Sequence, residues 1–271
     1  MSRGASPPGD AHAAMSQHYT FGDNDRAAQR LRNLAAAYES TSAAFLVRFA
    51  GSYPQQVADL GAGLGFTTRL VHEITGARAT VGLDSSARYV ALANTNAPSG
   101  IRHMVHDVTL APFPGGEPDF VYARFLLTHL AQPGVVLATW REASAPGAML
   151  VLEETAELAS EHPALRRYYA MVEAMQESYG QALRVGRALA ELATGSGWRV
   201  IDHHVTPVAV SGSQMAKLHV ENIRTWKNDP FAMSHLDPDD VAQVEERLDA
   251  IAEGRDEASV VAAMGQMVAL R

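Results

Sequence analysis

Short apolar runs alternate with helical patterns through the middle of the chain. The apolar runs cover residues 57–60, 80–83, 101–105, 119–122 and 148–152, and the helical patterns cover residues 67–74, 86–93 and 135–143. Runs of this length predict strands, and strands that alternate with helices predict βαβ units in a mainly parallel sheet. We therefore expect an α/β fold whose ligand site lies at the carboxyl ends of the strands.

Helical patterns also stand before the first strand. Asp23 or Asn24 is typical of a helix cap, an apolar stripe follows to position 34, and a second helix covers positions 45–49 before Pro54 ends the region. Residues 1–18 lack such a pattern and are expected to form a flexible tail. Residues 19–55 are then an N-terminal helical cap on the domain that follows.

Two further helical stretches fall between the last strands. Residues 155–180 carry one apolar stripe, and residues 211–256 hold two helical patterns, the second starting at Asp237 and Pro238. Between them, residues 181–192 are typical of a crossover helix and residues 198–210 of a sixth strand, and residues 259–270 predict a last strand. We interpret residues 56–271 as one domain with lid insertions at about 155–180 and 211–256, because both insertions follow strands.

The composition excludes several classes of site. The chain has 271 residues, 22 basic and 30 acidic residues, a net charge of −8 and no cysteine. Disulfides, thiolate metal sites and cysteine nucleophiles are therefore excluded. The negative charge argues against nucleic acid and anionic membranes as partners. No apolar run is long enough for a membrane span or a signal peptide, so we expect a cytoplasmic protein.

A glycine-rich turn follows the first predicted strand. It contains Asp59, Gly61, Gly63 and Gly65. A dinucleotide fingerprint needs its third small residue three positions after the second glycine, where this chain has Phe66. A nicotinamide reductase is disfavoured for this reason, and also because Asp59 would repel a pyrophosphate. The turn suits a ligand that carries positive charge, although glycines at such a turn also occur only for packing.

Two aspartates end the next strands. Asp84 lies 25 residues after Asp59, at the end of the second strand, where a carboxylate accepts hydrogen bonds from ribose hydroxyls. Asp107 ends the third strand and can accept a hydrogen bond from an adenine amine. Each aspartate alone is also typical of a cap or turn. Together with the glycine turn, they indicate a nucleoside ligand.

This combination resembles the class I S-adenosylmethionine-dependent methyltransferases. The resemblance covers about residues 55–210 and the last strand, and it rests on Asp59, Gly61, Gly63, Gly65, Asp84, His106–Val108 and Asp119–Tyr122. The family fold implies a Rossmann-like sheet of seven strands, mainly parallel, whose last strand is antiparallel. S-adenosylmethionine is the implied cofactor.

The resemblance also implies roles for individual residues. The glycines at 61, 63 and 65, with Asp59, would approach the methionine part of the cofactor, and Asp84 with Ser85 the ribose. Asp107 and Val108 would take the adenine, and Arg124 would line the sulfonium side. Tyr19, ahead of a helix with Arg30, would close over the methionine end.

Missing motifs narrow the chemistry. Residues 123–126 lack the Asp/Asn-Pro-Pro-aromatic signature of DNA amino and glutamine methyltransferases, and the aspartates of metal-dependent catechol-type enzymes are not evident. We expect a metal-independent enzyme. His129, which follows the fourth strand, is the leading candidate for a general base, although a capping or packing role is the alternative. Other candidates are His203, His204, His219, His235 and Glu154.

Polar and aromatic side chains in the two insertions predict a substrate pocket. Glu153 and Glu154 end the fifth strand, so one is expected to face the pocket and the other solvent. His203 and His204 should face opposite sides of a strand and are interpreted as structural. The expected substrate-binding residues are Tyr168, Tyr169, Met171, Met175, His219 and Trp226.

The sequence therefore predicts a methyltransferase that acts on a small organic molecule, such as a secondary metabolite. Methyl transfer to oxygen or nitrogen is slightly favoured over transfer to carbon. The alternatives are a cofactor-retaining protein with non-methylating chemistry such as cyclisation, and a catalytically silent binding protein. The sequence leaves open whether the chain forms a homodimer.

Overall fold

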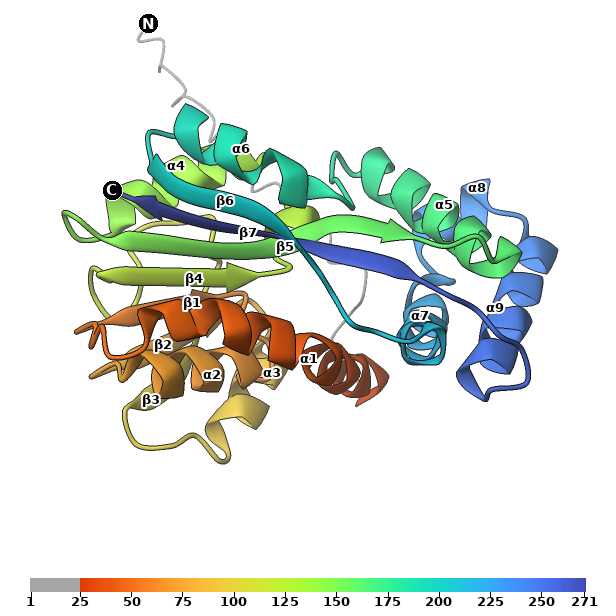
Figure 1. Ribbon diagram of the computed structural model, residues 1–271, viewed down its shortest axis with the longest axis horizontal. Coiled ribbons are helices and arrows are strands. Elements are labelled where there is room, and N and C mark those ends of the chain that lie inside the picture. Colours follow the sequence, from red (N-terminus) through yellow and green to blue (C-terminus); the bar gives the residue numbers. More distant parts are fainter. Residues whose placement is uncertain (1–24) are drawn as a thin grey trace, which may run out of the picture.

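A seven-stranded sheet with the strand order β3-β2-β1-β4-β5-β7-β6 organises the fold (Figure 1). The computed structural model describes residues 25–271, so Tyr19, Asp23 and Asn24 lie outside the described residues. The strands are β1 (Val57–Leu60), β2 (Thr80–Asp84), β3 (Ile101–Val105), β4 (Phe120–Arg124), β5 (Met149–Ala159), β6 (Arg199–Pro207) and β7 (Val261–Leu270). The pairs from β3 to β5 are parallel, and β7 is antiparallel to both neighbours, as predicted.

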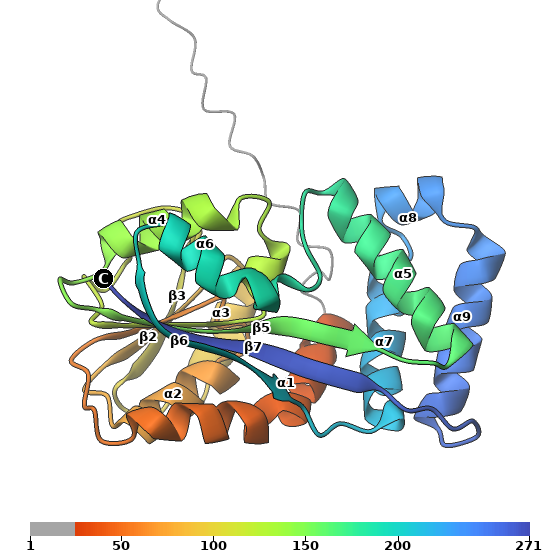
Figure 2. The same ribbon diagram turned by 45° about the horizontal axis from the view of Figure 1, so that its top comes forward.

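Helices cover both faces of the sheet. They are α1 (Asp25–Leu46), α2 (Phe66–Thr75), α3 (Ala87–Asn94), α4 (Pro133–Ala143), α5 (Pro163–Ser178), α6 (Leu189–Gly195), α7 (Gly212–Trp226), α8 (Pro230–His235) and α9 (Pro238–Ala252), with short 3₁₀ helices η1 (Val47–Phe49), η2 (Leu127–His129) and η3 (Val185–Ala188). Figure 2 shows α1 and α2 on one face and α4 and α6 on the other. This two-sided cover explains why the strands read as continuous apolar runs.

Strands β5 and β7 continue beyond the ends of β1 to β4, with β6 paired along most of β7, and they carry a helical lobe made of α5, α7, α8 and α9 (Figures 1 and 2). The sequence predicted that the fifth strand ends at Glu153 and Glu154, but β5 runs to Ala159, with a register shift between Thr155 and Glu157. The sequence does not predict this continuation, because the acidic residues at 153 and 154 are typical of a strand end that faces solvent. The predicted insertion at 155–180 therefore begins as a strand.

Two helix predictions also differ from the structure. One continuous helix, α1, replaces the two helices expected before the first strand, since no glycine or proline interrupts residues 25–46. The crossover helix expected at 181–192 is η3 followed by α6. Gly186 in η3 packs against the sheet so closely that a Cβ there would meet the backbone of Glu154 and Thr155, which requires the irregular start.

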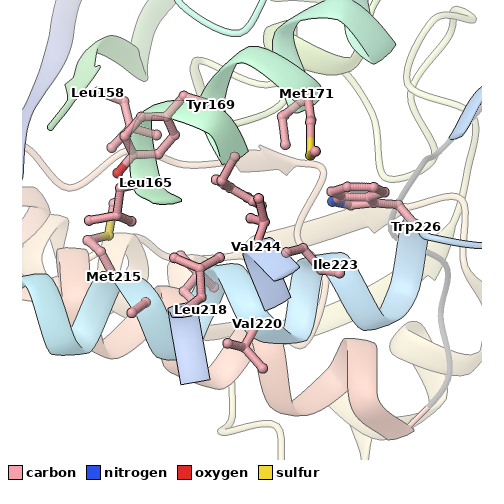
Figure 3. Close-up of a cluster of buried hydrophobic side chains, with 14 of the residues drawn as sticks. Leu158, Leu165, Tyr169, Met171, Met215, Leu218, Val220, Ile223, Trp226 and Val244 are labelled. Carbon is pink, nitrogen blue, oxygen red and sulfur yellow. The ribbon is translucent and has the colours of Figure 1, made fainter. Parts of the chain in front are cut away.

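A hydrophobic core joins the lobe helices to one another. Figure 3 shows side chains of α5 facing those of α7, with Met171 and Trp226 pointing into the space between the two helices. Both side chains are almost fully buried, as are Leu165, Ile223 and Leu248. The lobe is therefore held by its own apolar packing as well as by the long strands.

A buried polar network ties α1 to the sheet. The Glu153 carboxyl group is fully buried and accepts hydrogen bonds from Ser42 at 2.5 Å, from Tyr122 at 2.7 Å and from Gln266 at 2.7 Å. Arg124 extends the network, because its guanidinium donates to the Ser42 hydroxyl at 2.9 Å. The network satisfies these buried polar groups and fixes the position of α1 above β4, β5 and β7.

The substitution Glu153→Ala should therefore lower the free energy of unfolding by about 3 kcal/mol or more, because three buried donors lose their acceptor at about 1–3 kcal/mol each. Urea unfolding checks this. Glu157→Gln is the matched control, since Glu157 pairs with Arg187 at 2.8 Å near the surface, where a salt bridge contributes about 0–1 kcal/mol. Equal effects of the two substitutions would contradict the role of the network.

Candidate functional site

The carboxyl ends of β1, β2 and β4 lie side by side at one edge of the sheet. Leu60 is in register with Leu83 on β2 and with Ala123 on β4. The backbone N–H groups of Gly61 and Ala62 both donate to the Leu83 carbonyl, at 2.8 and 3.0 Å. The glycine turn is thereby fastened between the ends of two strands, where parallel sheets form ligand sites.

A cavity of about 160 Å³ opens beside this turn. Many of the predicted cofactor residues and the predicted base line it, namely Gly61, Gly63, Asp84, Ser85, Asp107, Val108, Arg124 and His129. Leu31 and Leu34 from α1 and Leu126 from the loop after β4 add apolar surface. The cavity therefore combines carboxylates, backbone amides and apolar walls in one place.

Glycine is required in the turn for two different reasons. Gly61 and Gly63 have φ values of +70° and +52°, a region that is strained for other residues, and both line the cavity. Gly65 does not line this cavity. It precedes α2 with φ of +82°, and a Cβ there would collide with the His103 ring. Gly65 thus allows close packing of α2 against β3.

Asp84 connects the glycine turn to the start of α3. One carboxylate oxygen accepts a hydrogen bond from the backbone N–H of Gly63 at 2.8 Å, and the other accepts from Ser86 at 2.8 Å. The side chain also faces the cavity. Asp84 therefore orders the turn and presents carboxylate lone pairs to the site.

Asp107 folds the chain after β3. Its Oδ1 atom accepts hydrogen bonds from the Thr109 amide at 3.0 Å and the Thr109 hydroxyl at 2.7 Å. The residue is exposed on the cavity rim, and Val108 beside it is buried. This pair therefore offers one polar and one apolar contact at the end of the cavity nearest β3.

Asp59 is buried below the cavity rather than in its wall. Its Oδ2 atom accepts hydrogen bonds from Thr67 at 2.8 Å and Thr68 at 2.6 Å, both in the first turn of α2. Burial raises the pKa of Asp59 to about 6, although the two threonine hydrogen bonds oppose the rise. Asp59 therefore fixes the turn to α2 and places a carboxyl group behind the glycines.

A larger, open groove of about 670 Å³ lies on the α1, α2 and α3 side of the turn. Gly65, His103 and Arg124 are among its lining residues, but Asp84 and Asp107 are not. The strand-end carboxylates thus belong to the smaller cavity. We assign the site to the smaller cavity for that reason.

A second cavity of about 90 Å³ lies between α1, the end of β5, α5 and α7. It shares Arg30, Leu34, Phe125 and His129 with the first cavity. The two cavities are therefore neighbours with a common wall at the point where the lobe meets the sheet.

The structure divides the predicted substrate residues into two groups. Tyr168, Tyr169 and His219 line the second cavity. Met171, Met175 and Trp226 do not line it and lie instead in the hydrophobic core of the lobe. A helical stripe shows which side chains are buried, but it does not distinguish a cavity wall from a helix–helix contact.

Several lining residues were not predicted. They are Tyr38 from α1, Phe125 from the loop after β4, Gln176 from α5 and Asn222 from α7. Asn222 lies three residues after His219 on the same helix face, so that spacing could have indicated it. The tertiary fold alone brings Tyr38 and Phe125 to the cavity, where their rings meet edge to face with centroids 4.8 Å apart.

His129 lies in the common wall of the two cavities. Its backbone carbonyl accepts a hydrogen bond from the side-chain amide of Gln181 at 2.9 Å, which fixes the end of η2. Burial, together with the positive charge of Arg30, lowers the pKa of His129 to about 3. The imidazole is therefore neutral at physiological pH and is able to accept a hydrogen bond from a bound molecule.

The loop that carries Phe125 and His129 is held in a strained conformation. Phe125 has φ of +55°, which costs on the order of 1–3 kcal/mol for a bulky residue. The Glu154 side chain compensates by accepting hydrogen bonds from the amides of Leu126 at 2.7 Å and Leu127 at 2.6 Å.

The expectation that either Glu153 or Glu154 faces solvent is wrong, because hydrogen bonds inside the protein engage both fully buried side chains.

The remaining candidate bases lie outside the two cavities. His203 contacts the Gly186 carbonyl at 2.9 Å, and His204 contacts Gln266 at 3.2 Å. His235 is exposed and stacks on Phe231 with ring centroids 4.6 Å apart. None of these three is among the residues that line the common wall.

Metal-binding clusters and membrane-spanning helices are both absent from residues 25–271. Within this range, no group of three or more histidine, aspartate or glutamate side chains is arranged to hold a metal ion. No helix in the same range is both long and apolar enough to cross a membrane.

The role of Glu154 can be tested through the pH dependence of stability. Burial raises the pKa of Glu154 to about 8, from 4.5. The folded protein then holds a proton that the unfolded chain releases, so the free energy of unfolding should fall as the pH rises from about 4.5 to 8. Between pH 7 and 8.5 the loss is about 1 kcal/mol.

Glu154→Gln keeps a carbonyl oxygen for the two loop amides and removes the titration. In urea unfolding, the variant should lack the fall in stability between pH 7 and 8.5. Glu177→Gln, on the exposed side of α5, is the control and should keep it. A fall of the same size in Glu154→Gln would contradict the assignment.

Comparison with known proteins identifies the family. The family model described as a methyltransferase domain matches residues 23–203. No curated protein sequence matches the chain significantly. Among solved structures, a chain of the complex between the Haloferax volcanii Trm112 methyltransferase activator and a methyltransferase is similar, with a TM-score of 0.57, 18% identity, and coverage of 90% of this chain and 95% of that chain.

Two further structures share the fold. The Haemonchus contortus phosphoethanolamine N-methyltransferase 2 has a TM-score of 0.56 and 15% identity, covering 89% of this chain and 56% of that chain. The [4+2]-cyclase SpnF has a TM-score of 0.53 and 14% identity, covering 85% of this chain and 80% of that chain. The family match covers most of the chain, and the sheet has the seven-stranded order with one antiparallel strand. The chain therefore belongs to the methyltransferase-domain family, within the class I fold whose members use S-adenosylmethionine.

Proposed function

We propose that the protein binds S-adenosylmethionine in the first cavity and transfers its methyl group to a small organic acceptor in the second. The observation that carries this proposal is the common wall formed by Arg30, Leu34, Phe125 and His129. Methyl transfer is an in-line displacement, so donor and acceptor must meet at one point with little water present. Orientation of this kind contributes about 7–11 kcal/mol to catalysis.

The residues of the first cavity suit this cofactor. Gly61 and Gly63 leave room for a ligand to approach the backbone, and a side chain at Gly63 would crowd Leu31. Asp84 and Asp107 provide carboxylates for hydroxyl and amine donors, and the Asp59 carboxyl group behind the turn favours a cationic ligand. The cofactor supplies an activated methyl group, and these residues bind and orient it.

Tyr19 would close over the cofactor from the N-terminal segment, and Arg124 and Ser85 would complete the wall. Gly65, which packs against His103, would act on the cofactor only through the shape of the turn. The N-terminal cap and the lobe would together form the lid over both ligands.

The second cavity suits a small acceptor that needs no metal ion. Its walls are mostly apolar and include Phe125, Val172 and Leu218. We propose that the acceptor, such as a secondary metabolite, presents an oxygen or nitrogen atom to the common wall. The neutral His129 imidazole accepts a hydrogen bond from that atom. It takes the proton once the forming bond to the methyl group has made that proton strongly acidic, as a base with a pKa of about 3 requires.

Replacing Asp84 tests the cofactor site. Asp84→Ala should weaken binding of S-adenosylhomocysteine by roughly 1–3 kcal/mol, because hydrogen bonds to a charged acceptor are lost. Isothermal titration calorimetry gives the affinity. Asp239→Ala, at an exposed position, is the control. Asp119→Ala is unsuitable, because the Asp119 carboxylate accepts hydrogen bonds from the backbone of Gln55 and Gln56. An unchanged affinity in Asp84→Ala would refute the assignment.

Replacing His129 tests the proton acceptor. His129→Ala should lower kcat by about 10²-fold or more if the imidazole removes a proton. Because its pKa lies near 3, the wild-type protein should show no loss of kcat from His129 protonation between pH 5.5 and 8. The exposed His235→Ala is the control. Undiminished turnover of His129→Ala across this pH range would remove His129 from the mechanism.

Transfer of a labelled methyl group to an acceptor is the direct assay for the reaction. Binding of the cofactor with no transfer to any acceptor would favour the alternative of non-methylating chemistry or of a silent binding protein. Binding of NADPH without binding of S-adenosylmethionine would contradict the proposed function.

A further inference from the structure

A cluster of buried polar side chains lies at the lobe end of the second cavity. It consists of Tyr168, Tyr169 and Gln176 on α5 and His219 and Asn222 on α7, which we call the lobe polar cluster. None of the five side chains is more than 7% exposed. Five polar groups in the core of an apolar lobe need partners, because an unpaired buried polar group costs about 1–3 kcal/mol.

The hydrogen bonds inside the cluster do not satisfy it. Asn222 donates to the Tyr168 hydroxyl at 2.8 Å, but the Asn222 carbonyl oxygen has no protein partner among the described residues. The Gln176 side-chain carbonyl oxygen and the Nδ1 atom of His219 also lack partners in residues 25–271. All three residues line the cavity. The three atoms themselves are covered by protein, so a bound molecule would use the two carbonyl oxygens as acceptors only after these side chains turn toward the cavity.

One hydrogen-bond donor of the Tyr169 and His219 pair has no acceptor within the pair. The Tyr169 hydroxyl and His219 Nε2 are 3.2 Å apart and share one hydrogen bond. Burial lowers the pKa of His219 to about 3, so the imidazole is neutral and carries a single N–H. If that proton is on Nε2, the Tyr169 hydroxyl proton remains unused, and if it is on Nδ1, the Nδ1–H remains unused. In either case the cluster offers a donor as well as acceptors.

Charge is distributed unevenly along the cavity. Burial raises the pKa of Tyr168 and of Tyr169, so both hydroxyls are neutral, and the other cluster members carry no charge. Among the described lining residues, the ionised side chain is Arg30, at the common wall. Its positive charge lowers the pKa of both His129 and Tyr168. Arg184 also opposes the rise in the pKa of Tyr169, but it is already paired with Glu173. An ionised group at the lobe end would therefore be buried without a counter-ion of its own, which is unfavourable.

Size and shape limit the occupant further. The cavity of about 90 Å³ is smaller than the 150 Å³ that accommodates benzene in an engineered protein core, so even a single substituted ring requires the walls to widen, and larger ring systems are disfavoured. Flat rings form part of the surroundings, because Tyr168 and His219 are stacked with centroids 4.2 Å apart. A planar molecule fits such walls better than a branched one of the same volume.

We infer that the acceptor is a single-ring phenol with an uncharged hydrogen-bonding substituent, such as a hydroxyl or carboxamide, at the end remote from the reacting oxygen. The lobe polar cluster binds that substituent, and the reacting hydroxyl lies at the common wall, where Arg30 favours its ionisation. A phenol, with a pKa near 10, is within reach of such a shift, whereas an aliphatic alcohol is not. This inference rests on the proposed function, since it names the acceptor for the same pair of cavities.

A matched series of para-substituted phenols tests the inference by binding. The probes are 4-hydroxybenzamide, 4-methylphenol, 4-hydroxybenzoate and tyramine, whose remote groups are polar and neutral, apolar, anionic and cationic. They are titrated by calorimetry into protein that has first been saturated with S-adenosylhomocysteine. We expect 4-hydroxybenzamide to bind at least tenfold more tightly than each of the other three.

Substitutions in the lobe polar cluster test whether its unpaired atoms cause the preference for 4-hydroxybenzamide. Asn222→Leu and His219→Phe keep the approximate volume and remove the unpaired polar atoms. Each should reduce the preference for 4-hydroxybenzamide over 4-methylphenol by about tenfold while binding of 4-methylphenol is kept. Lys217→Gln, on the exposed face of α7, is the control and should change neither affinity. Thermal unfolding verifies that each variant is folded.

The outcomes separate the two proposals. Failure of S-adenosylhomocysteine to bind in the first titration contradicts the proposed function. If it binds, then equal affinities for the four probes, a preference for a charged or apolar probe, or no binding of any probe overturns the inference about the acceptor. A preference that survives both Asn222→Leu and His219→Phe overturns the assignment to the lobe polar cluster.

Discussion

The hydrogen bonds from the loop after β4 to the Glu154 side chain fix the position of that loop at the junction of the two cavities. They hold Leu126 and Leu127, and thereby keep Phe125 at a φ of +55° that the chain would not adopt alone. Glu154 can do this because β5 does not end where β4 ends. The strained loop presents Phe125 and His129 to both cavities, so this half of the common wall depends on one buried carboxyl group.

The long β5 and β7 strands explain how one chain provides two neighbouring ligand sites. The short strands end at the first cavity, whereas β5 and β7 continue past it and carry the helical lobe. The second cavity lies where this lobe meets α1. Under the proposed function, the sheet domain would bind the cofactor and the lobe would select the acceptor. The network around Glu153 keeps α1, and with it Arg30, in position beside the sheet domain and the lobe.

Local chemistry made part of the site predictable from the sequence. Glycines at positive φ and acids at strand ends have local causes, so the positions of Gly61, Gly63, Asp84 and Asp107 followed from turn and strand patterns. The helical stripe in α5 did not distinguish Tyr168, at the cavity, from Met171 and Met175, in the core, because the 3.6-residue period reports burial and not the partner.

Features with tertiary causes could not be predicted in this way. The positive φ of Phe125 and the burial of Glu154 depend on residues far apart in the chain. The continuation of β5 was concealed by two glutamates whose partners come from α1, β4, β7 and the loop after β4. A crystal structure with S-adenosylhomocysteine bound would show whether donor and acceptor meet at the wall of Arg30, Leu34, Phe125 and His129. We expect the sulfur atom of the bound molecule to contact that wall. A cofactor bound in the open groove beside Gly65 and His103, or with its sulfur directed away from the wall, would contradict this expectation.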